Sequence, residues 1–581
     1  MVNITIDDIN ADVPENYTIL NAAKKLGIEV PTLCFLKELN EVAACRICMV
    51  EIEGYNRLSA ACNTPVFEGM VVKTHSPRVR KARKANLELI LSQHNTACTT
   101  CVRSENCSLQ TLTKKYNLTE TPYRQHVANV IWPQTSPLIR DADKCVSCLR
   151  CINVCRTIQG LGVWGLEGVG TRTHVGLSEG RDIFETDCTY CSQCVTHCPV
   201  GALHERNDVE TVLGFIDDPT LTTVVQVAPA VRTSWAEMLG IPADETSIGY
   251  LADALRKVGF TYVFDTSFSA DVTIMEEGSE LVSRLGNPEA TLPMFTSCCP
   301  GWIRFVKSQY PQLLPHISTT KSPQQIFGEL TKTYLAQKNG LDPAKVRCIS
   351  IMPCVSKKDE AANTPFVLDP TELEVDAVLT TRELPRLLAA ASVDVERLES
   401  KGFDDPLGEA SGAGFIFGAT GGVMEAALRS AYFLVEGTNP DPDAFKAIRG
   451  LRGWREGSFT VGGTELKIAI AHGLENAREL IEAVLAGTVN YHFIEIMTCP
   501  GGCVGGGGQP IIDGKELAEG RAKKLYAEDA SVALRFSHEN QSVLKAYEEY
   551  LEAPFSHKAE HLLHIEYGEL LEQCGAKGED R

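Results

Sequence analysis

Twenty-two cysteines among 581 residues constrain this chain more than any other feature of its sequence. Most of them stand in spaced groups. The first residues, MVNITIDDIN, contain neither a basic segment nor an apolar run, so we expect no export signal and a cytoplasmic protein. Disulfides do not persist in that compartment, where clustered thiols are typically metal ligands or catalytic groups. The cysteines therefore predict several metal centres.

The charge and hydropathy of the chain argue against two classes of partner. Lys and Arg number 55 against 75 Asp and Glu, which gives a net charge of −20. Sequence-independent binding to nucleic acid or to an acidic membrane surface needs positive charge, so we expect neither. No apolar run reaches the roughly 20 residues of a membrane span. The length fits about four domains of roughly 150 residues each.

Two cysteine runs share the spacing C-x2-C-x2-C-x3-C and give the strongest local signal. They are Cys145, Cys148, Cys151 and Cys155, and then Cys188, Cys191, Cys194 and Cys198. This duplicated run is the pattern of bacterial ferredoxins with two [4Fe–4S] clusters, in which the fourth cysteine ligates the other cluster. We therefore predict one cluster on the first three cysteines with Cys198, and another on Cys188, Cys191 and Cys194 with Cys155. Zinc-finger spacing does not produce two such runs.

A further cysteine group lies near the N-terminus, at Cys34, Cys45, Cys48 and Cys62. Residues 1–70 read as short strands broken by turns, in the segments NITID, YTIL, CMVEIEGY and VVKT. A C-x2-C pair with two more thiols brought in by loops can hold a [2Fe–2S] cluster, because thiolates suit iron–sulfur clusters or zinc. A structural zinc site with four thiolates is the alternative.

The next group comprises His94, Cys98, Cys101 and Cys107. It follows a basic stretch between Arg78 and Lys84 and the apolar segment LELILSQHN, which predicts a helix. One helical turn would bring His94 and Cys98 to the same side. By itself the group predicts a weak, zinc-like site. The basic stretch is either a solvated helix face or a docking surface for an acidic electron carrier.

From about residue 210 apolar strands alternate with helical stretches. The expected strands are TTVVQVAP, FTYVFDTS, PMFTSCCPGW, VRCISIMPC and FIEIMTCPGGC, and three of them end in cysteine. Ligands of doubly wound α/β domains bind beyond the carboxyl ends of the strands, so these thiols can converge on one metal site. Flanking Pro and Gly residues would let the backbone approach a bulky cofactor closely. Cys348 lies inside a strand and is expected in the core.

Three motifs carry a resemblance to [FeFe]-hydrogenases: FTSCCPGW at 295–302, MPCVSKK at 352–358 and EIMTCPGGC at 495–503. The resemblance covers essentially the whole chain. It includes the four accessory-cluster sites of the large monomeric, ferredoxin-linked type. It implies a [2Fe–2S] cluster on the N-terminal cysteines and a [4Fe–4S] cluster on His94 with Cys98, Cys101 and Cys107. The implied reaction is the reversible conversion of two protons and two electrons to H₂.

The resemblance also implies the ligands of the catalytic H-cluster. Cys299, Cys354, Cys499 and Cys503 would ligate a [4Fe–4S] cubane, which Cys503 bridges to a two-iron unit carrying CO, cyanide and an amine-containing dithiolate. Lys357 would bind a cyanide. The remaining pocket positions are Met352, Met497, Ala228, Pro229, Ala230, Phe417 and Gln324. Some family members carry serine in place of Ala230, so a hydrogen bond to the cofactor is expected to be absent here.

Protons need a route to a buried centre. Glu277, Glu280 and Arg284 share one helix face, and their spacing alone favours a surface ion-pair ladder. The resemblance implies instead a relay through Cys298, Glu277, Ser318, Glu280 and Arg284. Cys298 stands near the start of an expected helix, which could lower its pKa.

The predicted architecture is multidomain, α+β and α/β. It comprises a β-grasp ferredoxin-like [2Fe–2S] domain (1–78), a small His/Cys cluster domain (79–125), a bacterial two-cluster ferredoxin domain (126–209) and a two-lobed α/β catalytic domain (210–581). The expected partners are ferredoxin or flavodoxin and maturation proteins, and the expected state is a monomer. Cys574, in the acidic C-terminal tail, is expected to have no role.

Three alternative functions remain open on the sequence. The first is an NADH-dehydrogenase-like electron-transfer subunit, and the others are a hydrogenase-like iron–sulfur assembly protein and an H₂ sensor. The first fits the N-terminal clusters but not the cysteines of the second half. A match to G-x-G-x-x-G at 160–165 has no strand before it and no crossover helix after it, so we expect no dinucleotide site there.

Overall fold

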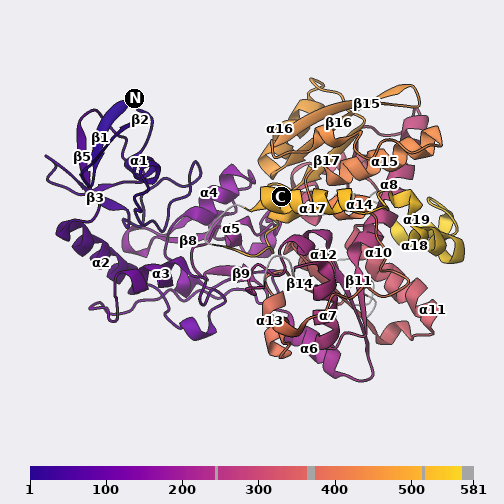
Figure 1. The fold of residues 1–581 in the computed structure, drawn as a ribbon, viewed down its shortest axis with the longest axis horizontal. Helices are drawn as coiled ribbons and strands as arrows, with labels where there is room; N and C mark the ends of the chain where they lie inside the picture. Colours follow the sequence, from indigo (N-terminus) through magenta and orange to yellow (C-terminus); the bar gives the residue numbers. More distant parts are fainter. Residues whose placement is uncertain (242–245, 363–372, 513–516, 566–581) are drawn as a thin grey trace. The chain divides into compact units, whose positions relative to one another are not determined.

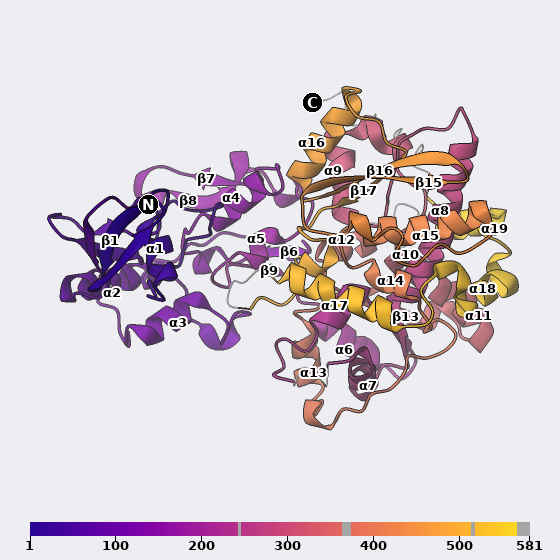
Figure 2. The same cartoon turned by 45° about the horizontal axis from the view of Figure 1, so that its top comes forward.

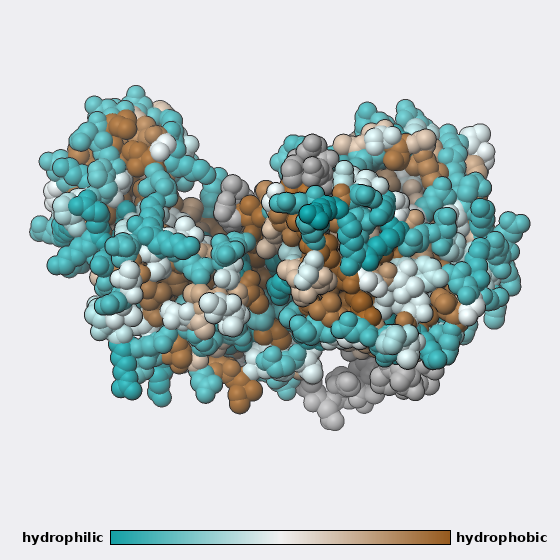
Figure 3. Space-filling view, turned by 60° about the horizontal axis from the view of Figure 1, so that its bottom comes forward, coloured by the Kyte–Doolittle hydropathy of each residue, from teal (hydrophilic) through white to brown (hydrophobic). Residues whose placement is uncertain are grey.

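The structure, a computed structural model, describes residues 1–241, 246–362, 373–512 and 517–565. The chain divides into two compact units (Figure 1). The first comprises Met1–Thr157, Leu161–Thr186 and Gln193–His204, and the second comprises Ile158–Gly160, Asp187–Ser192 and Glu205–Arg581. None of the described helices combines the length and the apolar character that spanning a bilayer requires. The face drawn in Figure 3 carries mostly hydrophilic side chains, with apolar patches among them.

A five-stranded mixed sheet opens the first unit. Its order is β2 (Ile9–Val13), β1 (Val2–Ile6), β5 (Met70–Lys73), β3 (Met49–Ile52) and β4 (Ser59–Ala60). β1 and β5 are parallel neighbours, and the other pairs are antiparallel. The strand predicted for YTIL is wrong. Thr18 accepts a hydrogen bond from the Asn21 N–H at 3.3 Å and begins helix α1 (Ile19–Lys25), because capping satisfies an otherwise unpaired donor.

Helix α2 (Pro77–Leu91) carries the basic stretch. Ser76 caps it and Pro77 occupies its first turn, a position that suits the missing N–H of proline. Arg83 is buried and donates to the Met49 carbonyl at 2.7 and 3.2 Å, so this part of the basic stretch anchors the helix to β3. Arg80 and Lys84 are exposed.

The rest of the first unit consists of short elements. It contains α3 (Ser108–Lys115), α4 (Arg150–Thr157), α5 (Gln193–Thr196), the antiparallel hairpin of β7 (Trp164–Glu167) and β8 (His174–Leu177), and the pair of β6 (Leu138–Arg140) and β9 (Leu203–Glu205). The G-x-G-x-x-G match runs into this hairpin, at Gly165 of β7.

Two four-stranded sheets organise the second unit. One has the order β11 (Tyr262–Asp265), β10 (Thr222–Val227), β13 (Val346–Met352) and β14 (Ala377–Thr380), and all its strands are parallel. The other has the order β12 (Met294–Phe295), β17 (Phe493–Met497), β16 (Thr464–His472) and β15 (Trp454–Val461), with β15 antiparallel. The five predicted strands are confirmed. β14, β15 and β16 were not predicted.

Helices cover these two sheets of the second unit. They include α6 (Val209–Asp217), α7 (Ile248–Val258), α9 (Pro300–Gln309), α10 (Pro323–Leu330), α11 (Ala336–Asn339), α12 (Ser356–Ala362), α13 (Leu384–Ala390) and α16 (Leu474–Leu485). Helix α8 (Thr266–Gly286) contacts both β10 of the parallel sheet and α15 (Gly422–Glu436). It is buried from Thr266 through Gly278, which places its polar residues inside the unit.

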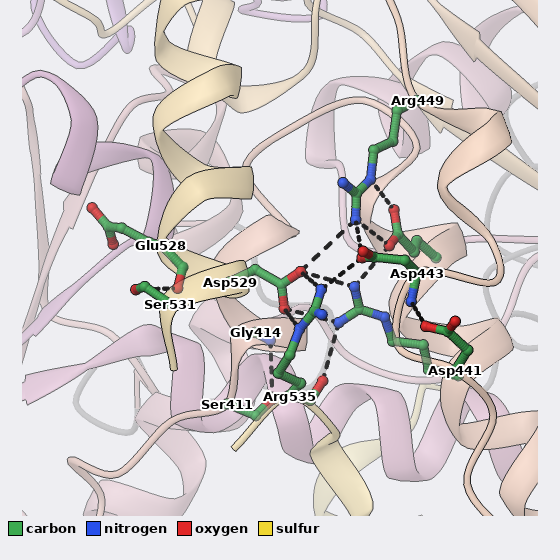
Figure 4. Close-up of polar contacts among 11 residues, drawn as sticks. Ser411, Gly414, Asp441, Asp443, Arg449, Glu528, Asp529, Ser531 and Arg535 are labelled. Carbon is green, nitrogen blue, oxygen red and sulfur yellow. Dashed lines mark hydrogen bonds and ion pairs between the residues drawn. The ribbon is translucent and has the colours of Figure 1, made fainter. Parts of the chain in front are cut away.

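The C-terminal segment is bound to this unit by buried charges (Figure 4). Its helices are α17 (Ala518–Ser531), α18 (Gln541–Ala546) and α19 (His557–Leu563), and α17 packs on α14 (Gly412–Ile416), as Figure 2 also shows. Asp529 of α17 accepts hydrogen bonds from Arg429 of α15 at 2.9 and 3.0 Å and from Arg535 at 2.6 Å. The Arg429 and Asp529 side chains are fully buried. Losing either would break a buried ion pair between α17 and α15, so α17 is an integral part of the unit.

Candidate active site

One cavity of the second unit collects the cysteines that follow three strands. Cys298 and Cys299 follow β12, Cys354 follows β13, and Cys499 and Cys503 follow β17, and all five line the cavity. The other pocket positions expected from the sequence also line it: Ala228, Pro229, Ala230, Gln324, Met352, Lys357, Phe417 and Met497. Thr266, Ala270, Pro323, Gly418 and Thr498 line it too and were not anticipated.

Glycines allow the chain to close around this cavity. Gly501 and Gly502 have φ of 79° and 89°, a region that favours glycine. A Cβ on Gly506 would lie 2.2 Å from the Pro353 carbonyl oxygen, and one on Gly502 would lie 2.6 Å from the Thr420 nitrogen. The glycine run after Cys503 is therefore required by close contacts between backbone segments.

The four expected cubane ligands lie close enough to one another to interact. Burial, followed by the nearby Cys299, raises the pKa of Cys354 to about 12. Burial and the neighbouring thiols also raise the pKa of Cys503 and Cys499. The Cys354, Cys499 and Cys503 thiols therefore resist ionisation by themselves, and a bound cation would offset that cost. The donor set therefore fits an iron–sulfur cluster, since thiolates are soft ligands.

The described residues contain no group of three or more His, Cys, Asp or Glu side chains placed to hold a metal ion. Ligation of clusters by these cysteines therefore stays a prediction.

Lys357 brings a positive charge into the cavity. It lies on helix α12. Its Nζ donates to the Cys298 carbonyl at 3.2 Å and to both Glu360 oxygens at 2.8 and 3.0 Å. Burial acts to lower the pKa of Lys357, but Glu360 and the nearby thiols raise it above its ordinary value. The ammonium group therefore stays charged in an apolar setting.

Glu360 is a functional residue that the sequence reasoning missed. It follows Lys357 by three residues on one helix, a spacing that could have identified the pair. Ser322 and Gln324 each donate to Glu360 Oε2 at 2.9 Å. The Oε1 of Gln324, which lines the cavity, has no hydrogen-bond partner among the described residues. Glu360 thus orients Lys357 and is itself oriented by its neighbours.

The expected proton relay lies along α8 and is buried. Ser318 donates its hydroxyl to Glu280 Oε2 at 2.7 Å, and Arg284 donates to Glu280 Oε1 at 2.5 Å. The Glu277 and Glu280 side chains are 0% and 3% exposed, which excludes the surface ion-pair ladder. Arg284 also donates to the Ile317 carbonyl at 3.0 Å, which fixes its guanidinium beside Glu280.

Glu277 and Cys298 are the expected inner members of this relay. Both Glu277 oxygens lack a hydrogen-bond partner among the described residues, although Ser297 and Ser318 lie near enough to favour its charged form. Burial and the nearby Glu280 raise the pKa of Glu277 to about 8, so it holds a proton at neutral pH. The lowered pKa expected for Cys298 is wrong, because burial, followed by the nearby Glu277, raises it.

The N-terminal cysteines of the first unit form one group. Cys34 interacts with Cys45, and Cys48 with Cys62, and the four thiols lie close enough to influence one another. Asn40 donates to the Cys34 carbonyl at 2.6 Å and to the Cys148 carbonyl at 2.9 Å. This buried amide joins two predicted cluster sites and was not foreseen.

His94 lies near Cys98, Cys101 and Cys107 as expected, but the predicted helical turn does not join it to Cys98. Helix α2 ends at Leu91, so His94 and Cys98 do not share a helical turn. A loop brings them together instead, and His94, Cys98, Cys101 and Cys107 line one cavity. His94 Nδ1 lies 2.9 Å from the Lys144 carbonyl. If Nδ1 carries the proton and donates there, Nε2 is free to ligate a metal.

The first ferredoxin-like ligand set lies around a small cavity. Cys145, Cys148, Cys151 and Cys198 all line it, together with Arg140 and Trp164. Of the second set, Cys155 and Cys194 belong to the first unit, whereas Cys188 and Cys191 belong to the second. Cys348 is fully buried in β13, which confirms its place in the core. Cys574 lies outside the described residues.

Family descriptions match successive parts of the chain. They are a 2Fe-2S iron-sulfur cluster binding domain at 1–77, the NADH-ubiquinone oxidoreductase-G iron-sulfur binding region at 83–122, a 4Fe-4S binding domain at 182–204, the C-terminal domain of the iron only hydrogenase large subunit at 221–507, and the iron hydrogenase small subunit at 515–569.

Relatives and a solved structure agree with these matches. The NADP-reducing hydrogenase subunit HndD of Solidesulfovibrio fructosivorans is 45% identical and aligns with 98% of this chain and 99% of that protein. Iron hydrogenase 1 of Clostridium pasteurianum is 38% identical over 98% of this chain and 100% of that protein. A variant of [FeFe]-hydrogenase HydA1 from Chlamydomonas reinhardtii is 41% identical with a TM-score of 0.56, covering 62% of this chain and 98% of that chain. The chain therefore belongs to the [FeFe]-hydrogenases and is an oxidoreductase that acts on H₂.

Proposed function

We propose that the cavity of the second unit holds an H-cluster, with Cys299, Cys354, Cys499 and Cys503 as ligands of its cubane. Cys503 would also bridge to the two-iron unit with CO, cyanide and an amine-containing dithiolate. When bound, this group would supply an iron Lewis acid and an amine base for the interconversion of protons and H₂. The observation that carries the proposal is that thiols from three strand ends line one cavity. The buried carboxyl groups of Glu277 and Glu280 lie on the neighbouring helix α8.

The protein would orient and insulate this group. Lys357, held by Glu360, presents a positive charge to an anionic cyanide ligand. Met352 and Met497 line the same cavity and pack as polarizable, apolar filler. Ala230 offers no side-chain hydrogen bond, so the pocket lacks the serine hydroxyl of some family members.

Protons would reach the cavity along α8. Arg284 and Ser318 bind the two oxygens of Glu280, and Glu277 lies nearby with its proton held at neutral pH. We propose that the proton moves from Glu280 through the Ser318 hydroxyl to Glu277 and then to the Cys298 thiol. Hydrogen-bond reach between these groups, directly or through one water, is what such transfer requires.

Electrons would arrive through one [2Fe–2S] and three [4Fe–4S] clusters on the cysteines of residues 34–198 and on His94. The domain limits at 78, 125 and 209, the monomeric state and the cytoplasmic location stay predictions. We propose ferredoxin or flavodoxin as the electron carrier. The similarity to an NADP-reducing hydrogenase subunit favours a second candidate, electron exchange with a partner chain that reduces NADP.

The decisive experiment is to express the chain with and without maturation proteins. The matured protein should show infrared bands of metal-bound CO and cyanide and should evolve H₂ with reduced ferredoxin. Material made without maturation should carry iron and sulfide but lack those bands and the activity. H₂ evolution by the unmatured protein would refute the cofactor assignment. H₂-dependent reduction of NADP only after a partner subunit is added would favour the second candidate for the carrier.

A further inference from the structure

A buried glutamate next to the proton relay is bound entirely by the C-terminal segment. Glu276 is fully buried on α8, immediately before Glu277. Its carboxylate accepts hydrogen bonds from the Tyr547 hydroxyl and from the Phe555 N–H, the latter at 2.9 Å. His564 Nε2 lies 3.1 Å from the same carboxylate. Three groups from beyond residue 540 therefore converge on a helix that carries the relay.

His564 connects this glutamate to the other side of the relay. Its Nδ1 lies 2.8 Å from the Thr319 hydroxyl oxygen, and its side chain is 7% exposed. A neutral imidazole satisfies both contacts if Nε2–H donates to Glu276 and Nδ1 accepts from Thr319. The Phe555 ring packs edge-on against the imidazole at 4.9 Å, which limits its rotation.

Thr319 in turn holds the outer carboxylate of the relay. Its backbone N–H donates to the two Glu280 oxygens at 3.1 and 3.3 Å, beside the Ser318 hydroxyl bond at 2.7 Å. The backbone reinforces this arrangement. The Ile565 N–H donates to the Thr319 carbonyl and the Lys321 N–H to the Leu563 carbonyl, both at 2.7 Å.

We propose that His564 is a positioning residue of the proton relay. It links Glu276 on α8 to Thr319 and so holds Ser318 within hydrogen-bond distance of Glu280. It does not carry the proton itself, because the contact between Thr319 and Glu280 is made by a backbone N–H, which does not release its proton. The inference rests on the relay proposed above and adds the C-terminal segment as the part that fixes its geometry.

The expected cost of losing His564 follows from the sensitivity of proton transfer to distance. Donor and acceptor must lie within roughly 2.6–3.2 Å, and a displacement of about 1 Å can cost about 100-fold in rate. Loosening one anchor should cost less, so we expect His564→Ala to lower H₂ evolution by roughly 3- to 30-fold. The solvent isotope effect should rise, because proton transfer would become more rate-limiting.

The test compares matured holoenzyme variants. His564→Ala and Thr319→Val should both slow H₂ evolution and H₂/D₂O isotope exchange, while the CO and cyanide bands and the rate of accessory-cluster reduction stay unchanged. Added imidazole should restore His564→Ala but not Thr319→Val. His561→Ala removes an exposed histidine of α19, three residues before His564, and should behave as wild type.

Glu280→Gln serves as the reference for the relay. If Glu280→Gln slows turnover while both His564→Ala and Thr319→Val keep the wild-type rate and isotope effect, the role of His564 is refuted and the relay survives. If Glu280→Gln is also unchanged, the relay fails and the inference fails with it. Should His564→Ala not fold, Thr319→Val decides alone, because it removes one hydroxyl and leaves the backbone contacts in place.

Discussion

Lys357, which lines the cysteine-lined cavity, places its Nζ 2.8 Å from Glu360 Oε2. The pair keeps a positive charge where burial alone would remove it. Glu360→Gln should therefore leave the lysine poorly oriented. We expect about a tenfold loss of turnover and a shift of the cyanide infrared bands, since breaking a buried ion pair leaves an uncompensated charge.

The matched control for this variant is Glu519→Gln. Glu519 pairs with Lys523 at 2.6 Å on the surface of α17, where solvent weakens such a pair. This control should change neither turnover nor the infrared bands. Wild-type cyanide bands in Glu360→Gln would show that Lys357 does not depend on its partner.

Cys298 is expected to be indispensable for turnover but not for cofactor retention. It lines the cavity without belonging to the proposed ligand set. Cys298→Ser and Cys298→Ala should keep the iron content and the CO bands of the wild type and lose at least about 100-fold in H₂ evolution, the usual scale for a lost acid–base group. Wild-type rates in both variants would remove this thiol from the proton path.

The raised pKa of Glu277 predicts a pH dependence of both turnover and stability. A carboxyl whose pKa is about 8 in the folded state binds its proton more tightly than in the unfolded chain, where the pKa is near 4.5. The resulting stability is complete below about pH 4.5 and is lost as the pH rises through about 8. H₂ evolution should fall over the same upper range as the proton leaves Glu277.

Glu277→Gln provides the comparison, because the amide stays neutral. Its melting temperature should equal that of wild type near pH 5 and exceed it increasingly towards about pH 9. Its turnover should be low at every pH. A constant difference in melting temperature across this range would mean that Glu277 does not titrate there.

Gly506 is expected to tolerate no side chain. A Cβ there would lie 2.2 Å from the Pro353 carbonyl oxygen and 2.8 Å from the Cys503 carbonyl oxygen, both backbone atoms that cannot move independently. Gly506→Ala should destabilise the fold by about 1–3 kcal/mol and reduce the iron bound by the matured protein. Thermal unfolding and metal analysis measure both effects.

Gly520→Ala is the control for backbone substitution. Nothing lies within 4 Å of a Cβ at Gly520, which stands inside α17. An alanine in a helix should stabilise by about 0.5–1 kcal/mol. Equal effects of the two substitutions would contradict the close packing inferred around Cys503.

The sequence was sufficient to predict the site residues that follow strand ends. Cys299, Cys354 and Cys499 each stand after an apolar strand that the structure contains, so their convergence follows from parallel topology. Other pocket positions, such as Phe417 and Gln324, were predicted from the family resemblance, because hydrophobic periodicity does not identify them. Those positions line the cavity, while their contact with a cofactor stays a prediction.

Long-range contacts were beyond the reach of sequence patterns. Glu276 and His564 are separated by 288 positions, and no spacing rule links them. Local capping caused the error at residues 17–20. Thr18 accepts a hydrogen bond from the Asn21 N–H and begins a helix inside an apparent strand. The antiparallel pair of β15 and β16 was not predicted.

The buried pair of Arg429 and Asp529 has a consequence for synthesis on the ribosome. The arginine is translated 100 positions before this aspartate, whereas Glu425, its other carboxylate partner at 2.7 Å, lies one turn earlier on α15. Until α17 emerges from the exit tunnel, Arg429 lacks its contacts with Asp529, so this lobe cannot reach its final packing cotranslationally. The cysteine-lined cavity should therefore close only after the polypeptide is nearly finished.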